Sequence, residues 1–242
     1  MAYKNSFAVV TGGASGFGYG IAAAFAARGA NVVIADINDN LGTKAAKELK
    51  GRFVHCDVSD NDSVSALIDG QQKIDIFVNN AGVTHFPMPA EEVEEDDFER
   101  VFRINMKSVF LTSKYVIPKM KATDGGVILN IASTAGVSPR PGLSWYNASK
   151  GWMITATRSL AVELAPHHIR VNAINPVAGE TPLLATFLGG DTVENREKFL
   201  KTIPLGRFST PDDIANAACF LCSEDADMLT GVTLEVDGGR CI

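Results

Sequence analysis

The stretch VVTGGASGFGYGIAAAF, residues 9–25, decides the fold class of this chain. It begins with apolar β-branched residues, ends in an alanine-rich segment, and carries glycines at positions 12, 13, 16, 18 and 20. This order predicts a strand, a tight turn and a helix. Because glycine tolerates positive φ and close backbone approach, the turn can bring the N–H groups of the helix start against a phosphate. The strict GxGxxG spacing is absent, so a glycine turn with only a packing role stays an alternative.

Seven apolar runs carry the strand signal along the chain and alternate with helical stretches such as GYGIAAAFAARG. Runs that are apolar at successive positions are typical of strands buried on both faces. We therefore expect an α/β fold in which helices cover both faces of a parallel sheet. The runs are FAVVT (7–11), NVVIAD (31–36), FVHCD (53–57), IDIFVN (74–79), GVILNIAS (126–133), VNAIN (171–175) and VTLEV (232–236).

Composition and charge exclude several classes of protein. The 242 residues are 46% hydrophobic and 21% charged, which is typical of one globular domain with a full core. A formal net charge of −6 without a Lys/Arg cluster argues against nucleic-acid binding. No apolar stretch is long enough to cross a bilayer, and the first ten residues lack the layout of a signal peptide. We expect a soluble cytoplasmic protein that binds neither nucleic acid nor membrane.

Cysteines and histidines give no metal signal. Cys219 and Cys222 form a CxxC inside the apolar helical run IANAACFLC, where core packing is favoured over redox or zinc chemistry. The four histidines lack the spacing of metal ligands, so we expect no catalytic metal. His85 follows the strand that ends at residue 79. It either borders a substrate pocket or faces solvent from a loop, and the second interpretation is favoured.

The chain reads as a single domain over residues 1–242, without a repeat or linker. A longer excursion, residues 176–230, separates the sixth and seventh apolar runs. We interpret it as containing a mobile lid over a pocket, because connections of this length usually carry function. A helical pair on the surface without a gating role is the alternative.

Two carboxylates follow predicted strands. Asp36 closes the second strand, eighteen residues after Gly18, close to the separation at which an acidic side chain binds the adenosine ribose hydroxyls. A carboxylate there repels a 2′-phosphate, so the sequence predicts NAD rather than NADP. Asp36 could instead only cap the following turn. Asp57, after the third strand, could contact the adenine or serve as N-cap of the helix from Asn61, and the sequence does not separate these roles.

Tyr146 and Lys150 stand one helical turn apart in SWYNASKGW, which puts a phenol and an ammonium on the same face. A charge pair about 4 Å apart at an effective dielectric of about 20 is worth about 4 kcal/mol. That energy could lower the pKa of the phenol by roughly three units. The sequence therefore predicts a tyrosine that exchanges protons with an alcohol near neutral pH.

In this order of motifs the sequence resembles the short-chain dehydrogenase/reductase family over essentially its whole length. The motifs are the glycine turn, Asp36, Asp57, NNAG (79–82), Asn105, Ser133, Tyr146 and Lys150. The resemblance implies a seven-stranded, doubly wound Rossmann sheet, an NAD(P) cofactor and a Ser-Tyr-Lys site. It also implies that Asn105 holds a water molecule that relays protons from the lysine.

The predicted roles follow from this arrangement. Ser133 donates a hydrogen bond to the substrate oxygen and Tyr146 transfers the proton. Lys150 lowers the pKa of Tyr146 and holds the nicotinamide ribose. The predicted catalytic residues are Asn105, Ser133, Tyr146 and Lys150. The predicted cofactor-binding residues are Gly12, Ser15, Gly16, Phe17, Gly18, Asp36, Asp57, Val58, Asn79, Asn80, Ala81, Gly82, Tyr146, Lys150, Pro176, Val177 and Thr181.

The loop after the sixth strand departs from the family pattern. Where the family has Pro-Gly, this chain has Pro176-Val177-Ala178-Gly179. The predicted substrate-binding residues are Ser133, Leu143, Tyr146 and Leu183. Further apolar loop positions, expected to line the same pocket, are Phe86, Met88, Val137, Trp145, Leu184 and Phe187.

We therefore predict an NAD-dependent oxidoreductase that acts on a small or medium secondary alcohol or its ketone. A 3-oxoacyl-thioester reductase acting on acyl-carrier protein is the rival activity. A non-catalytic dinucleotide sensor is the alternative from another class, and a serine hydrolase built on Ser133 is weaker because no acid–histidine pair can be named. Apolar residues in excess on segments 98–121 and 146–165 lead, with the resemblance, to an expected homotetramer.

Overall fold

The computed structural model describes residues 3–242. Within this range seven strands form one parallel sheet. The strands are β1 (Phe7–Thr11), β2 (Asn31–Asp36), β3 (Arg52–His55), β4 (Ile76–Asn79), β5 (Gly126–Ile131), β6 (Ile169–Pro176) and β7 (Thr233–Val236). The larger helices are α1 (Gly16–Ala27), α2 (Asp39–Leu49), α3 (Asn61–Asp69), α4 (Glu95–Val101), α5 (Ser108–Lys121), α6 (Ser144–Leu164), α7 (Leu184–Leu188), α8 (Val193–Leu200) and α9 (Pro211–Leu221).

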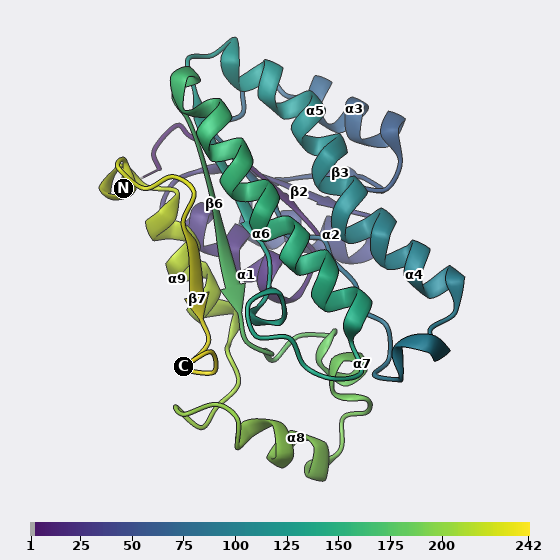
Figure 1. Cartoon of the computed structure of the whole chain (residues 1–242). Coiled ribbons are helices and arrows are strands. Elements are labelled where there is room, and N and C mark those ends of the chain that lie inside the picture. Colours follow the sequence, from purple (N-terminus) through teal and green to yellow (C-terminus); the bar gives the residue numbers. More distant parts are fainter. Residues whose placement is uncertain (1–2) are drawn as a thin grey trace.

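The strand order β3-β2-β1-β4-β5-β6-β7 reverses direction at β1, next to β4. Helices α1, α2 and α9 cover one face of the sheet, and α3, α5 and α6 cover the other (Figure 1). Alternate residues of one strand serve the two faces: Ala8 and Val10 pack with α1, whereas Val9 packs with α3 and α5. The predicted doubly wound, seven-stranded sheet is confirmed, and its apolar runs are continuous because both faces are buried.

The excursion between β6 and β7 divides into two structural parts. Helix α9 packs against α1 and belongs to the layer on one face of the sheet. Cys219 and Cys222 of α9 are buried in that layer, which confirms the prediction of core packing. Helices α7 and α8 lie beyond the carboxyl edge of the sheet (Figure 1). Only this part, from residue 180 to about residue 204, is placed as a lid would be, and its movement stays a prediction.

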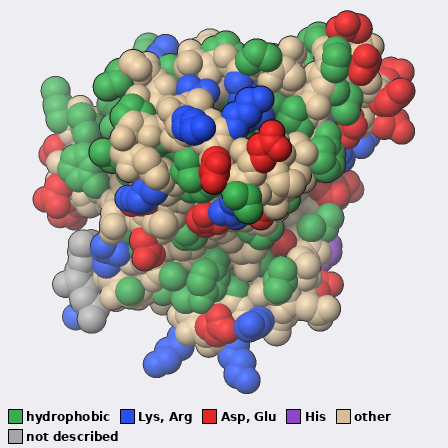
Figure 2. Space-filling model, turned by 90° about the horizontal axis from the view of Figure 1, so that it is seen from below, with side chains coloured by type: hydrophobic (Ala, Val, Ile, Leu, Met, Phe, Trp, Pro, Cys, Tyr) green, Lys and Arg blue, Asp and Glu red, His purple; other side chains and the backbone are tan. Residues whose placement is uncertain are grey.

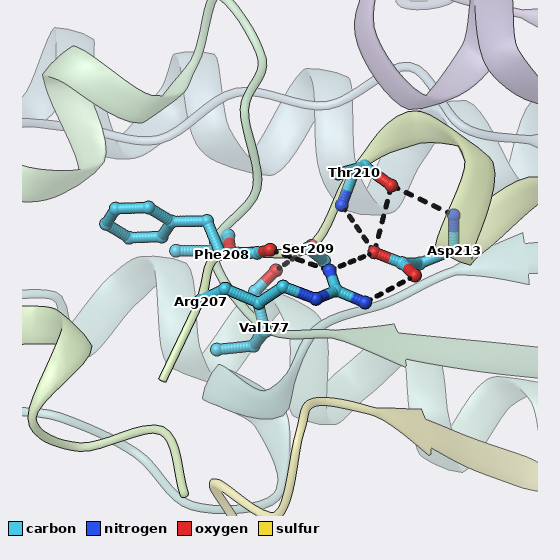
Figure 3. A network of polar contacts seen from close by, with 7 residues as sticks. Val177, Arg207, Phe208, Ser209, Thr210 and Asp213 are labelled. Atoms are coloured by element: carbon cyan, nitrogen blue, oxygen red, sulfur yellow. Dashed lines mark hydrogen bonds and ion pairs between the residues drawn. The ribbon is translucent and has the colours of Figure 1, made fainter. Parts of the chain in front are cut away.

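A polar network fixes the chain between α8 and α9, beside the loop that follows β6 (Figure 3). Arg207 donates to both carboxylate oxygens of Asp213 at 2.6 and 2.9 Å, and Thr210 and Asp213 form a capping box at the start of α9. The hydrogen bonds from Arg207 hold the pKa of Asp213 well below its usual range. Ser209 donates to the carbonyl oxygen of Val177 at 3.1 Å. The side chain of Ser209 thereby ties the loop that follows β6 to the segment that precedes α9.

No helix in residues 3–242 is long and apolar enough to cross a membrane.

Candidate active site

The site lies where β1 and β4 end side by side, the crevice at which open α/β sheets bind ligands. Asn80 connects the two strands, because its Nδ2 donates to the carbonyl oxygens of Thr11 and Gly12 at 2.9 and 3.1 Å. The Thr11 hydroxyl accepts from the backbone N–H groups of Asn80 and Ala81 and donates to Val78. The NNAG segment thus holds the glycine turn in place.

The glycine turn has the shape that a pyrophosphate requires. Gly12 and Gly16 adopt φ values of +61° and +55°, which favour glycine. A methyl group at Gly18 would overlap the carbonyl oxygen of Gly12 and the side-chain nitrogen of Asn80. The side chain of Ser15 makes no capping hydrogen bond, so α1 begins with free N–H groups and the positive end of its dipole. The backbone conformation of these residues therefore fits the pyrophosphate of a dinucleotide.

The two carboxylates after β2 and β3 behave differently from one another. Asp36 accepts hydrogen bonds from the backbone N–H groups of Ala14 at 3.1 Å and Asn38 at 3.0 Å, so it braces the glycine turn and caps the next turn at once. Asp57 accepts from the N–H and hydroxyl of Ser59, both at 2.8 Å. The N-cap of α3 is Asp60, so the interpretation of Asp57 as that N-cap is wrong. Contact of Asp36 or Asp57 with a cofactor stays a prediction.

Ser133, Tyr146 and Lys150 line one cavity at this edge of the sheet, together with Asn80 and Gly82 of the NNAG segment. Pro176, Val177 and Thr181 of the loop after β6 line it as well, and Thr181 lies beside Gly16. Ser133 follows the last residues of β5, and its Oγ accepts from the N–H of Ala135 at 3.1 Å. Tyr146 and Lys150 come from the first two turns of α6 and are both buried. The structure therefore brings these three predicted side chains together in one cavity, while their catalytic roles stay a prediction.

The pKa of Tyr146 differs from the expectation. Burial raises it, and a hydrogen bond with Ser133 and the positive charge of Arg140 work in the lowering direction. Lys150 is not the source of a lowering, since its Nζ lies 5.9 Å from the centre of the Tyr146 ring and donates to the carbonyl oxygen of Ile131 at 2.9 Å. Burial also lowers the pKa of Lys150 to about 8. The predicted lowering by Lys150 is wrong for the protein alone because desolvation of two buried groups outweighs their proximity.

Asn105 lies in a π-helical turn (Phe102–Lys107) between α4 and α5. Its side-chain amide accepts from the N–H of Val83 and donates to the carbonyl oxygen of the same residue, each at 2.9 Å. It also donates to Ser149 Oγ at 3.0 Å, between Tyr146 and Lys150. Turns of this kind occur frequently at functional sites. Asn105 therefore ties the loop after β4 to α6, while its predicted role in holding a water molecule stays a prediction.

A chain of uncharged polar groups runs under the site. Thr112 donates to the Asn79 side chain at 2.7 Å, Asn79 donates to Asn130 at 2.8 Å, and Asn130 donates to Thr157 at 2.8 Å. The four groups join α5, β4, β5 and α6. The Asn79 side chain is thus engaged inside the sheet and does not line the cavity, and contact of Asn79 with a cofactor stays a prediction.

The remaining predicted residues are divided between the cavity and its surroundings. The side chain of Val58 packs in the core with α3. Leu143 is fully buried behind Tyr146, in the apolar cluster that includes Leu184 and Phe187. Leu183, Leu184 and Phe187 line the cavity, as expected. The side chains of Phe86, Met88, Val137 and Trp145 do not line it.

His85 does not face solvent, so the favoured interpretation of this residue is wrong. It is 0% exposed, its Nδ1 hydrogen-bonds the carbonyl oxygen of Phe86 at 2.8 Å, and it does not line the cavity. Its position in a loop between a strand and a short helix suggested exposure, but the side chain is buried.

Arg140 is the residue near the site that the sequence analysis missed. It stands in the loop SPRPG between Ser133 and Tyr146, and its charge acts on Tyr146. A single basic residue in a loop of small residues and prolines was the available signal. It could not be used because its direction depends on α7 and α8, which are distant in sequence.

Comparisons with known proteins agree over the full chain. The family model of the enoyl-(acyl carrier protein) reductases matches residues 12–240. A 4-formylbenzenesulfonate dehydrogenase of Comamonas testosteroni is 48% identical, with 100% of both chains covered. A galactitol 2-dehydrogenase of Agrobacterium fabrum is 40% identical over 99% of both chains. The crystal structure of a 3-ketoacyl-(acyl-carrier-protein) reductase from Brucella melitensis, complexed with NADH, superposes with a TM-score of 0.94 at 46% identity and covers 99% of both chains.

Proposed function

This chain belongs to the short-chain dehydrogenase/reductase family, and we propose that it is an NAD-dependent dehydrogenase of secondary alcohols in which Tyr146 moves the proton. The observation that carries the proposal is a single cavity that contains Ser133, Tyr146 and Lys150 and is bordered by the NNAG segment beside the glycine turn. A cavity that placed only the glycine turn and Asp36 together would equally suit a dinucleotide sensor. A sensor would not need the buried hydroxyl group of Tyr146 in the same cavity.

The residues divide the reaction among themselves. The Ser133 hydroxyl donates to the substrate oxygen, and Tyr146, in its deprotonated phenolate form, accepts the proton from that oxygen as the alcohol is oxidised. Asn105 ties the loop after β4 to Ser149 of α6, and Lys150 ties α6 to the carbonyl oxygen of Ile131 at the end of β5. The glycine turn and the start of α1 hold the pyrophosphate, and Asp36 holds the adenosine ribose. When bound, the nicotinamide supplies the acceptor for the hydride that leaves the substrate carbon.

NAD(H) is supported as the cofactor by Asp36 and by the NADH in the Brucella relative. Neither arginine nor lysine stands at positions 13–15 or 37, where a 2′-phosphate would need a positive partner. The names of the relatives span alcohol, sugar-alcohol and aldehyde oxidation as well as 3-ketoacyl reduction. The hydrate of an aldehyde presents the same CH–OH group as an alcohol, so the same residues serve both.

The test is a panel of alcohols, ketones and aldehydes with NAD⁺, NADP⁺ and their reduced forms, followed at the absorbance of the reduced nicotinamide. We expect turnover of secondary alcohols with NAD⁺. Faster turnover of a 3-oxoacyl-carrier thioester with NADPH would instead support the rival reductase, for which the Brucella relative is the observation in favour. A protein that binds NADH but turns over no compound in either direction would be a sensor.

Replacing Asp36 by Asn should reduce the preference for NAD⁺ over NADP⁺ by about tenfold or more. A hydrogen bond to a charged group contributes about 1.5–3 kcal/mol, and the amide no longer repels a 2′-phosphate. The amide oxygen can still accept one of the two backbone hydrogen bonds that Asp36 makes. The ratio of kcat/KM values for the two cofactors measures the change.

Asp39→Asn is the matched control for this prediction. Asp39 begins α2, is exposed, and lies near Asp36 in the sequence, where it pairs with His55 at 2.8 Å. Equal changes in the two variants would show that the selectivity comes from general charge and not from contact of Asp36 with the ribose.

The proposal includes a cytoplasmic location and a homotetramer. The family membership supports the first. For the second, Phe102, Phe110 and Trp152 are 43%, 59% and 37% exposed on the π-helical turn, α5 and α6, where Val109, Met153 and Ile154 are buried. The exposed aromatic residues form the surface that would pair subunits. Light scattering on the purified protein measures the oligomeric state.

A further inference from the structure

A second cavity of about 380 Å³ lies against α8, and its polar side chains are mainly basic. The residues that carry its character are Arg140, Lys198, Arg240, Asn195, Thr202 and Phe199. No carboxylate lines it, although the chain has 28 acidic and 22 basic residues. Figure 2 views the molecule from the side at which α8 lies in Figure 1, and Lys and Arg side chains gather on part of that face.

The arginines of this cavity stack on aromatic rings and are not paired with acids. The Arg140 guanidinium carbon lies 4.5 Å from the centre of the Phe187 ring and 5.3 Å from that of Phe199, and Arg240 lies 5.7 Å from that of Phe199. Arg140 donates only to the carbonyl oxygen of Phe187, at 3.1 Å. Among residues 3–242 neither arginine forms a salt bridge.

Two like charges in a half-buried place repel each other. Burial and the charge of Arg240 both lower the pKa of Arg140. Such an arrangement is unfavourable in the protein alone and becomes favourable when an anion binds between the cations. Arginine also offers the fork of N–H groups that matches the oxygens of a carboxylate, sulfonate or phosphate.

The position of Phe187 connects this cavity to the active site. Its ring packs edge-on against Tyr146, with the ring centres 5.9 Å apart, and lines the active-site cavity. The Arg140 guanidinium stacks on the same ring. The two cavities share no lining residue, and Phe187, which contacts both Tyr146 and Arg140, separates them. A rotation of the Phe187 ring would open a path along which a substrate with its reacting carbon at Tyr146 brings its far substituent to the arginine.

We infer that Arg140 and Arg240 bind an anionic group of the substrate, a sulfonate or carboxylate at the end opposite the reacting carbon. This rests on the proposed function and names its substrate class. The Comamonas relative, whose named substrate carries a sulfonate on the ring opposite its formyl group, has the chemistry that such a site would recognise. The oxygens accept N–H hydrogen bonds from the guanidinium groups, and Lys198 adds charge at the rim of the cavity.

The kinetic experiment compares matched substrates with NAD⁺. The panel pairs 1-phenylethanol with 4-(1-hydroxyethyl)benzenesulfonate and 4-(1-hydroxyethyl)benzoate, and pairs benzaldehyde with 4-formylbenzenesulfonate. The measured quantity is the ratio of kcat/KM for the anionic compound to that for the neutral one.

Arg140→Met should lower this ratio about tenfold to a hundredfold, and Arg240→Met should lower it by less, since Arg240 stacks on Phe199 alone. The ratio is needed because losing the charge of Arg140 also changes the pKa of Tyr146 for every substrate.

Lys121→Met is the matched control. Lys121 is exposed at the end of α5. Its replacement by Met also removes one positive charge but should leave the ratio unchanged. Arg140→Lys covers the case in which Arg140→Met does not fold, and should lower the ratio by an intermediate amount because lysine keeps the charge without the fork. Equal losses for neutral and anionic substrates in every arginine variant would overturn the inference and assign these residues to the packing of Phe187.

A binding experiment separates this inference from the proposed function. Titration calorimetry of 4-toluenesulfonate, which carries no oxidisable alcohol, should show binding that Arg140→Met weakens at least tenfold. If that binding is found but no compound of the panel is turned over, the anion site stands and the proposed dehydrogenase activity fails. If 4-toluenesulfonate does not bind and the arginine variants impair only an acyl-carrier thioester, the cations serve the phosphate of a carrier and the small-anion inference is wrong.

Discussion

Tyr146→Phe should lower kcat for alcohol oxidation by about 10²- to 10⁴-fold while the protein keeps its fold and its affinity for NADH. Phenylalanine preserves the ring, which is buried and packs against Phe187, and removes only the hydroxyl. The loss therefore falls on the proton-transfer step. Steady-state kinetics with a secondary alcohol measures kcat, and fluorescence titration with NADH measures cofactor affinity.

The control for Tyr146→Phe removes a hydroxyl elsewhere. Tyr115 on α5 is half-buried, and its hydroxyl donates to Asn61 at 2.8 Å, away from the cavity. Tyr115→Phe should leave kcat within about twofold of the parent, as surface changes of this kind usually affect stability by less than about 0.5 kcal/mol. Retention of most activity in Tyr146→Phe would show that another group carries the proton.

Lys150→Met should reduce activity by about a hundredfold or more and change how stability depends on pH. Lys150 is 4% exposed, and burial lowers its pKa from 10.5 to about 8. The unfolded chain therefore binds more protons than the folded one between about pH 8 and pH 10.4, so the contribution of this lysine to stability becomes more favourable as pH rises through that window. The shift corresponds to about 3 kcal/mol at about 1.36 kcal/mol per unit.

The measurement is urea unfolding of the parent protein and of Lys150→Met at pH 7 and pH 10. Methionine has similar length and no charge, so the variant lacks the gain that the parent shows between the two pH values. At pH 7 two effects oppose each other in the variant: the buried cation is removed, and the Ile131 carbonyl loses its hydrogen bond, which costs about 1–3 kcal/mol. Parallel pH dependence in the two proteins would show that Lys150 is hydrated in solution and not desolvated.

The sheet was predictable because its signal is local. The five inner strands are mostly apolar and buried, so a single stretch such as NVVIAD identifies its own environment. The strands β3 and β7 at the two edges of the sheet are only partly buried. The positions of Ser133, Tyr146 and Lys150 followed for a related reason. A strand end and one turn of a helix fix where their side chains start, and parallel strands end at the same edge.

What could not be predicted depends on contacts between distant segments. The direction of the Lys150 side chain is set by the Ile131 carbonyl, and the raised pKa of Tyr146 is set by burial under α7. Arg140 acquires its place only when Phe187 and Phe199 pack on it from α7 and α8. His85 was assigned wrongly because its place in a loop after a strand does not show whether the side chain points to solvent or into the interior.

The row of amides and hydroxyls from Thr112 through Asn79 and Asn130 to Thr157 has a consequence for how the enzyme works across conditions. None of these four groups gains or loses a proton at any pH at which a protein stays folded. The hydrogen bonds that join α5, β4, β5 and α6 beneath the site therefore do not depend on pH, whereas Tyr146 and Lys150 above them are titratable groups whose pKa values are shifted by burial. A change of protonation state in the cavity therefore leaves these hydrogen bonds unchanged.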